Sequence, residues 1–349
     1  MNTTVFRRAA KVLVPLGAAA LVAAGCGSDD GDDAKAAGGS SSAKNDGAKV
    51  TLVAFSTPRE AHEEIIPAFN ETADGEGVEF EQSYGASGEQ SRAVEGGLPA
   101  SVVHLALEPD VTRLVEAGLV ADDWAAGEHK GIVSNSIAVL AVRKGNPKKI
   151  EDWDDLLGDD VEVLTPNPFT SGGARWNLMA AYGAWTRAGA DEQEGLDNLE
   201  TLLRNTSVQS KSAREALQVF TGGKGDVLIA YENEVIAAQQ AGEDIEYVIP
   251  KSTILIENPA AVLENAEDGD AAQAYYDFLL TDEAQKTFGE KGFRPEVESV
   301  LETFDFETPE DLFTIEDVGG WETVMTDFFD REKGKVAVIE QKLGVPTDG

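Results

Sequence analysis

Short apolar runs alternate along the chain with longer segments in which apolar residues recur every three or four positions. Such runs are typical of buried β-strands, and the longer segments are typical of amphipathic helices. We expect strands at residues 50–55, 78–84, 102–107, 137–142, 161–164, 227–231, 245–249 and 253–256. Because strands and helices alternate, the pattern indicates an α/β fold with largely parallel sheets.

Several of the predicted strands lead into a helix that begins with Ser or Thr. Thr57 stands before Pro58, which suits the first helical position, while Ser87, Ser171 and Ser212 open the other helices. The first backbone N–H groups of a helix have no intrahelical partner and lie at the positive end of its dipole, where anions bind. A single turn of this kind is ordinarily just a connection. Repeated turns could converge on one anion, although periodicity does not show that they meet.

Several segments, in this order, resemble the periplasmic sulfate-binding proteins of ABC importers. Residues 167–176 read NPFTSGGARW, and the other matching segments are 84–94, 105–107, 142–147, 152–156 and 225–234. The resemblance covers roughly residues 50 to 300 and implies the two-lobed (type II) periplasmic-binding-protein fold. Each lobe would hold a mixed, mainly parallel sheet flanked by helices, with the ligand in the cleft between the lobes. The implied lobes are 50–139 plus 250–349, and 140–249.

The resemblance also implies a set of sulfate-binding residues, by matching position. The backbone N–H donors would be Ser87, Gly172, Gly173 and Ala213, and the side-chain donors would be the Ser171 hydroxyl and Tyr231. Tyr231 stands where the family has a tryptophan indole, and Phe169 replaces a lysine that is common in the family. A phenol can accept as well as donate a hydrogen bond, so thiosulfate, molybdate and phosphate stay open as ligands beside sulfate.

Arginines follow the proposed anion-binding turns. They are Arg59, Arg92, Arg175 and Arg214. A direct bidentate contact with the anion is one reading. We expect instead that they pair with nearby glutamates, among them Glu60, Glu89, Glu215 and Glu234, and support the turns from behind.

The N-terminus reads as a targeting segment. Residues 1–25 have the positive start, short apolar run and small-residue end of a signal peptide. The only cysteine, Cys26, follows directly, and Ala-Ala-Gly-Cys resembles a bacterial lipobox, which implies a lipid anchor and an extracytoplasmic protein. Residues 26–49 are polar and glycine-rich, as in a flexible tether. Export by the general or the twin-arginine route stays open.

The formal net charge of −36 argues against nucleic acid and anionic membrane surfaces as partners. The same charge would slow the approach of sulfate, but salt screens it over roughly 10 Å at 0.1 M. Local donors can therefore still bind an anion on contact. The partners that we expect are sulfate or a related oxyanion and the transmembrane permease of an ABC importer, with the protein itself monomeric.

Other kinds of site have little support in the sequence. His62, His104 and His129 have no metal-ligand spacing, and we expect no metal and no cofactor. We expect His62 to lie on an exposed helix and His104 to be buried with its hydrogen bonds satisfied. The competing functional class is an extracytoplasmic serine hydrolase that uses Ser171 or Ser87, but the characteristic nucleophile turn is missing from the turns considered. We therefore expect a binding protein and not an enzyme.

Overall fold

The computed structural model describes residues 45 and 47–347, which fall within one compact unit. Its strands are β1 (Lys49–Phe55), β2 (Glu79–Gly85), β3 (Val102–His104), β4 (Ile132–Arg143), β5 (Val163–Leu164), β6 (Thr206–Val208), β7 (Val227–Tyr231), β8 (Ile245–Val248), β9 (Ser252–Val262) and β10 (Asp311–Phe313). Its helices are α1 (Arg59–Asn70), α2 (Ser87–Glu95), α3 (Glu108–Glu116), η1 (Trp153–Leu157), α4 (Gly172–Arg187), α5 (Glu192–Asn205), α6 (Ala213–Thr221), α7 (Glu232–Gln240), α8 (Gly269–Leu279), α9 (Asp282–Glu290), α10 (Glu298–Leu301), η2 (Ile315–Val318), α11 (Gly320–Asp327) and α12 (Lys335–Leu343).

The strands form a mixed sheet in the order β2-β1-β3-β9-β4-β7-β5-β6. At one end β2, β1 and β3 are parallel, and at the other end β7, β5 and β6 are parallel. The two long strands between them, β9 and β4, pair antiparallel with each other and with their outer neighbours. The fold class predicted from the sequence, an α/β protein with two lobes, is confirmed.

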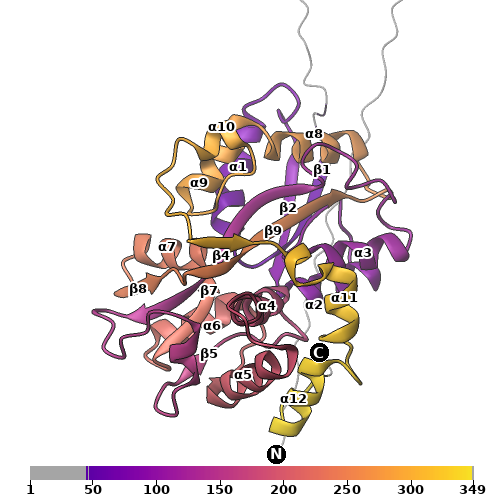
Figure 1. Cartoon of the computed structure of the whole chain (residues 1–349). Coiled ribbons are helices and arrows are strands. Elements are labelled where there is room, and N and C mark those ends of the chain that lie inside the picture. The colour runs from indigo at the N-terminus through magenta and orange to yellow at the C-terminus, as the bar shows by residue number, and fades with distance from the viewer. Residues whose placement is uncertain (1–44, 46, 348–349) are drawn as a thin grey trace, which may run out of the picture. The chain divides into compact units, whose positions relative to one another are not determined.

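We call the elements around β2-β1-β3 lobe 1 and those around β7-β5-β6 lobe 2. Helices α1, α8 and α9 pack together in lobe 1, and α6 and α7 pack on β7 in lobe 2. Strands β4 and β9 run side by side between the two groups (Figure 1). The predicted boundary at 139/140 falls inside β4, which pairs with β9 through its first half and with β7 through its second. The residue boundaries of the lobes stay a prediction.

Strand β4 is longer than the apolar run suggests. Its first half includes polar residues that are nevertheless buried, such as Ser134 and Ser136, because β9 covers that stretch as a neighbouring strand. The sequence pattern also missed the short strands β6 and β10. Strands of three residues carry too few positions to show a period.

One predicted helix start and one predicted exposure are wrong. Helix α1 begins at Arg59 with Pro58 as its N-cap, and no side chain caps it, so Thr57 is not the cap. His62 is fully buried: its Nδ1 lies 2.8 Å from the Tyr275 hydroxyl and its Nε2 lies 2.9 Å from Nδ1 of His104. The expectation that His104 is buried with hydrogen-bond partners is confirmed.

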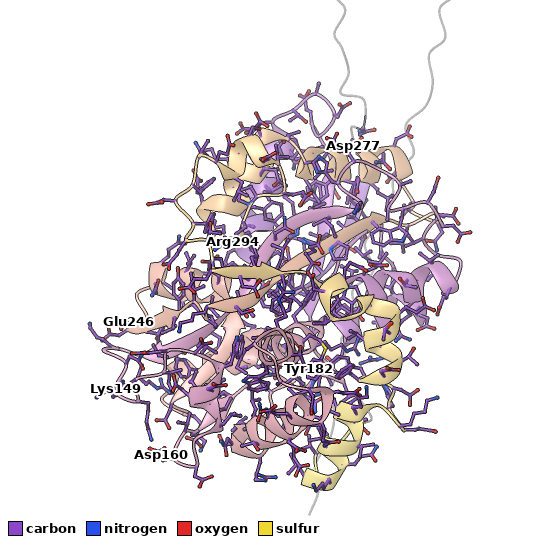
Figure 2. The ribbon with its side chains drawn as sticks, in the orientation of Figure 1. Lys149, Asp160, Tyr182, Glu246, Asp277 and Arg294 are labelled. Atoms are coloured by element: carbon purple, nitrogen blue, oxygen red, sulfur yellow. The ribbon has the colours of Figure 1, made fainter. Side chains whose placement is uncertain are left out.

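The C-terminal part contacts both lobes. Helix α11 packs on α3, and α12 packs on α5. Tyr182 of α4 meets the Phe328 ring, with ring centroids 4.9 Å apart. Arg294, after α9, donates hydrogen bonds to the Glu232 carboxylate of α7 at 2.7 and 3.1 Å, and both side chains are buried. Figure 2 labels Tyr182 and Arg294.

The predicted signal peptide, Cys26 and most of the predicted tether lie outside the described residues. The end of that tether is part of the folded unit: the Asn45 side chain donates to the carbonyl of Asp74 at 2.7 Å, and β1 begins at Lys49. No helix within residues 45 and 47–347 is long and apolar enough to cross a membrane.

Candidate functional site

A small cavity, partly open to solvent, lies where the strand-to-helix turns of both lobes meet. The residues that line it are Phe55, Ser56, Thr57, Gly85, Ala86, Ser87, Ala106, Ser171, Gly173, Ser212, Ala213 and Tyr231. They come from the turns before α1, α2, α3, α4 and α6 and from the end of β7. The structure therefore brings together Ser87, Ser171, Gly173, Ala213 and Tyr231, which the resemblance implied.

The cavity is surrounded by helix N-termini. Helices α2, α4 and α6 begin at Ser87, Gly172 and Ala213, each directly after an extended residue. The first N–H groups of each helix lack intrahelical partners, and their dipoles have the positive end at this side. For α6, the Ser212 hydroxyl accepts one such N–H, that of Glu215, at 3.2 Å, which confirms Ser212 as a cap. This arrangement favours an anion without a basic side chain in contact with it.

Helix α4 is buried on nearly all sides, which fixes the turn at its start. Gly172 to Trp185 are all buried, and an apolar helix without a polar face is typical of a protein core. The Trp176 indole donates to the Ala106 carbonyl of lobe 1 at 2.7 Å. Gly172 does not line the cavity, because it packs against lobe 1: a Cβ at Gly172 would lie 2.3 Å from Leu107 Cδ2. Only glycine allows this close approach.

Gly173 lies close to both the Ser171 hydroxyl and the Tyr231 ring. A Cβ at Gly173 would lie 3.5 Å from Ser171 Oγ and 3.4 Å from Tyr231 Cε1. The turn of α4 and the end of β7 thus present two hydroxyl-bearing side chains to the same space. Ser171 is the N-cap residue by position, but its side chain makes no cap hydrogen bond, so α4 does not use the hydroxyl.

Tyr231 is 1% exposed, and its hydroxyl has no hydrogen-bond partner within the part of the chain that the structure describes. Burial raises the pKa of Tyr231 well above its ordinary value, and the charge of Glu234 raises it further. The phenol is therefore protonated and able to donate. The Asn258 side chain opposes this rise in the pKa of Tyr231. The Asn258 amide nitrogen donates to the Ala106 carbonyl at 3.0 Å, while Asn258 Oδ1 has no hydrogen-bond partner among the described residues.

Ser87 uses its hydroxyl within the protein. The hydroxyl donates to Asp110 Oδ2 at 2.6 Å and accepts the Ala106 N–H at 2.9 Å. The side chain therefore fixes the start of α2 against α3 and β3. What remains for a ligand is the backbone N–H of Ser87, the group that the resemblance implied. The contact with Asp110 could not be predicted from local sequence, since α3 lies two elements further along the chain.

None of the predicted supporting arginines lines the cavity. Arg214 forms an ion pair with Glu60, as expected. Arg175 is buried, donates to the Pro168 carbonyl at 2.9 Å and lies 3.9 Å from Asp110, which was not among the expected partners. Burial lowers the pKa of Arg175.

The other two arginines pack beside the lobe 1 turns. Arg59 lies over the Tyr84 ring, 4.7 Å from its centroid, and a Cβ at Gly88 would lie 3.3 Å from Arg92 Nη1. Arg59 and Arg214 also line a larger open pocket that shares Ser56, Gly85, Ala86 and Ser212 with the cavity. We interpret this pocket as the entrance to the cavity.

A serine hydrolase would need a histidine beside Ser171 or Ser87, and the hydrogen bonds of the three histidines go to other residues. The histidine nitrogens bond elsewhere: His62 to Tyr275 and His104, His104 to Ser134, and His129 to Glu296. No group of three or more His, Cys, Asp or Glu residues in the described ranges could hold a metal ion.

Known proteins match this chain over most of its length. Residues 50–294 match the family model described as bacterial extracellular solute-binding protein. The sulfate-binding protein of Synechocystis sp. is 42% identical over 309 residues, 85% of this chain and 88% of that protein. The thiosulfate-binding protein of Pseudomonas aeruginosa is 34% identical over 291 residues, 79% of this chain and 88% of that protein.

A solved structure agrees with these matches. The sulfate-binding protein SubI from Mycobacterium tuberculosis H37Rv is 45% identical, with a TM-score of 0.79, and the match covers 81% of this chain and 100% of that one. The chain therefore belongs to the family of bacterial extracellular solute-binding proteins that includes these sulfate-binding proteins.

Proposed function

We propose that the protein captures sulfate outside the cytoplasm and delivers it to the transmembrane permease of an ABC importer. The observation that carries this proposal is the convergence of the N-termini of α2, α4 and α6 on one cavity that also holds the Ser171 and Tyr231 side chains. The proposed donors are the N–H groups of Ser87, Gly172, Gly173 and Ala213 and the hydroxyls of Ser171 and Tyr231. The names of the relatives support sulfate or thiosulfate as the ligand.

The charge pattern of the cavity suits an anion that carries no proton. Sulfate can only accept hydrogen bonds, and the residues that line the cavity include no Asp or Glu to repel it. Hydrogen bonds to a charged group contribute about 1.5–3 kcal/mol each. Hydrogen phosphate would bring a proton that needs an acceptor, and a site made mainly of donors leaves that proton unmatched, so binding is weaker.

The position of the cavity explains how binding could control delivery. The turns before α1 and α2 belong to lobe 1, whereas Ser171, Ala213 and Tyr231 belong to lobe 2. A ligand that contacts both lobes binds the closed arrangement better than the open one and shifts the population toward it. The permease would then recognise the closed form. We further infer that a lipid on Cys26 tethers the protein to the outer surface of the cell membrane, and that it acts as a monomer without catalysis.

Isothermal titration calorimetry of the purified protein with sulfate, thiosulfate, molybdate and phosphate at neutral pH tests the proposed ligand. We expect sulfate to bind more tightly than phosphate by at least tenfold in Kd. Tighter binding of thiosulfate than of sulfate would retain the site and change its ligand. Absence of binding to all of the oxyanions would refute the proposed function.

A further inference from the structure

Thr57 lines the cavity, and its hydroxyl has no hydrogen-bond partner among the described residues. Thr57 lies between β1 and α1, lines the cavity and is 6% exposed. Its Oγ1 is buried and has no hydrogen-bond partner within residues 45 and 47–347. Capping would be the ordinary use of a threonine next to a helix, but α1 begins at Arg59 after Pro58 and has no side-chain cap. The hydroxyl therefore has no structural task in its own helix.

Other threonines of this chain do satisfy their hydroxyls. Thr253, which is fully buried, donates to the Ala138 carbonyl at 2.7 Å. Thr72, at the far end of α1, donates to the Phe69 carbonyl at 2.7 Å. Burying a hydroxyl without a partner costs free energy, so an exception calls for a cause. At Thr57 the exception coincides with the cavity.

Without Thr57, only lobe 2 would offer side-chain hydroxyl donors to the ligand. Lobe 2 presents the side chains of Ser171 and Tyr231, whereas the hydroxyl of Ser87 in lobe 1 is taken by Asp110. We propose that the Thr57 hydroxyl is a further ligand-binding group, which donates a hydrogen bond from lobe 1 to an oxygen of the tetrahedral oxyanion. This inference rests on the proposed function and adds a residue that determines affinity.

The test is the variant Thr57→Val, which keeps the branched shape and removes only the hydroxyl. In titrations with sulfate, we expect Kd to rise about 10- to 100-fold, as for the loss of a hydrogen bond to a charged group. Thr57→Ser should keep Kd within a few-fold of the wild type. Without sulfate, the thermal midpoint of Thr57→Val should equal or exceed that of the wild type, because the variant no longer buries an unpartnered hydroxyl.

Thr72→Val is the matched control, because Thr72 lies just after the end of α1, as Thr57 lies just before its start. It removes a hydroxyl that has a partner within the protein, so we expect a lower thermal midpoint and an unchanged Kd for sulfate. An unchanged Kd in Thr57→Val would overturn the inference, and so would a drop in midpoint without sulfate as large as that of Thr72→Val. If the wild-type protein itself binds no oxyanion, the proposed function fails, and this inference fails with it.

Discussion

The guanidinium of Arg214 donates two hydrogen bonds to the carboxylate of Glu60, at 2.5 and 2.6 Å. Arg214 stands in the first turn of α6 in lobe 2, and Glu60 stands in the first turn of α1 in lobe 1. Arg214 also donates to the Ser56 carbonyl at 3.2 Å, directly beside the cavity. Burial tends to raise the pKa of Glu60, but the hydrogen bonds and charge of Arg214 lower it overall. The pair therefore connects the lobes through two helices that begin at the site.

Removing this ion pair should weaken ligand binding modestly. About a third of each side chain is exposed, 32% for Arg214 and 39% for Glu60, so the pair contributes about 0.5–1 kcal/mol. For Arg214→Gln we expect Kd for sulfate to rise roughly 2- to 5-fold in calorimetric titrations. Lys144→Gln, which breaks an exposed pair with Asp244 away from the cavity, is the control and should leave Kd unchanged. A loss of 100-fold or more would contradict the supporting role and indicate direct contact with the anion.

Replacing Tyr231 by Phe should weaken binding strongly. The substitution removes only a hydroxyl that has no partner among the described residues, so the protein loses no internal hydrogen bond. We expect Kd for sulfate to rise about 10- to 100-fold, since a hydrogen bond to a charged group is lost. Tyr182→Phe is the control: Tyr182 lies in α4 but packs on Phe328, so this variant should bind sulfate with the affinity of the wild type. Equal affinity in Tyr231→Phe would assign Tyr231 to packing alone.

The buried histidine pair should make the protein sensitive to acid. Burial lowers the pKa of His62 to about 3 and that of His104 well below its ordinary value, so both are neutral in the folded state. In the unfolded state histidine binds a proton near pH 6.5. The stability that depends on neutral histidine is thus complete above about pH 6.5 and is lost as the pH falls toward 3, by about 1.4 kcal/mol per pH unit for each histidine.

Urea unfolding at pH 7.5 and pH 5 checks this expectation. On going from pH 7.5 to pH 5, the free energy of unfolding should change less favourably in the wild type than in His62→Gln, which has one such histidine fewer; the difference between the two proteins isolates the histidine from groups such as Glu340 that titrate with the opposite sign. The same pH dependence in both proteins would show that the histidines do not cause the loss.

Glu340 should have the opposite pH dependence. It is fully buried on α12, and burial raises its pKa to about 7, although hydrogen bonds from the Gln209 amide at 2.8 and 3.0 Å oppose this. Stability that depends on protonated Glu340 is complete below about pH 4.5 and is lost as the pH rises through 7. Glu340→Gln should therefore raise the free energy of unfolding at pH 8 by about 1–3 kcal/mol and change it little at pH 5. Destabilisation at pH 8 would show that the charged carboxylate is needed.

The proposed lipid anchor depends on Cys26. In cells that produce the Cys26→Ser variant, we expect the protein to move from the membrane fraction to the soluble extracytoplasmic fraction, because a serine cannot form the thioether that holds the lipid. Immunoblots of the two fractions measure the distribution. Retention of the variant in the membrane fraction would mean that something other than Cys26 holds it there.

The sequence predicted the main strands and several helix starts because these depend on local patterns. The apolar run that becomes β1 and the serine that caps α6 are examples. The prediction that His62 is exposed is wrong, although its spacing from Ile65 and Phe69, three and seven residues on, puts it on the apolar face of α1. The polar ring can be buried there because Tyr275 and His104, which are distant in sequence, satisfy its nitrogens.

The cavity itself could not be predicted from periodicity. Ser87 and Tyr231 meet there because β9 and β4 lie between the two groups of parallel strands, and this pairing joins residues more than a hundred positions apart. The resemblance supplied five of the twelve residues that line the cavity, namely Ser87, Ser171, Gly173, Ala213 and Tyr231. The unpartnered polar atoms of Thr57 and Asn258 could not be predicted, because their hydrogen bonding depends on neighbours that only the folded chain brings near.

The hydroxyls of Thr57 and Tyr231 have no hydrogen-bond partners among the described residues. The chain alone cannot satisfy them once they are buried, so molecules without sulfate favour arrangements in which water reaches both groups. In the proposed site, sulfate would remove that penalty by accepting a hydrogen bond from each hydroxyl. The two unpartnered hydroxyls would thus disfavour the closed form when no sulfate is bound. A permease that recognises only the closed form would then rarely bind a molecule without sulfate, and ATP would seldom be hydrolysed without import.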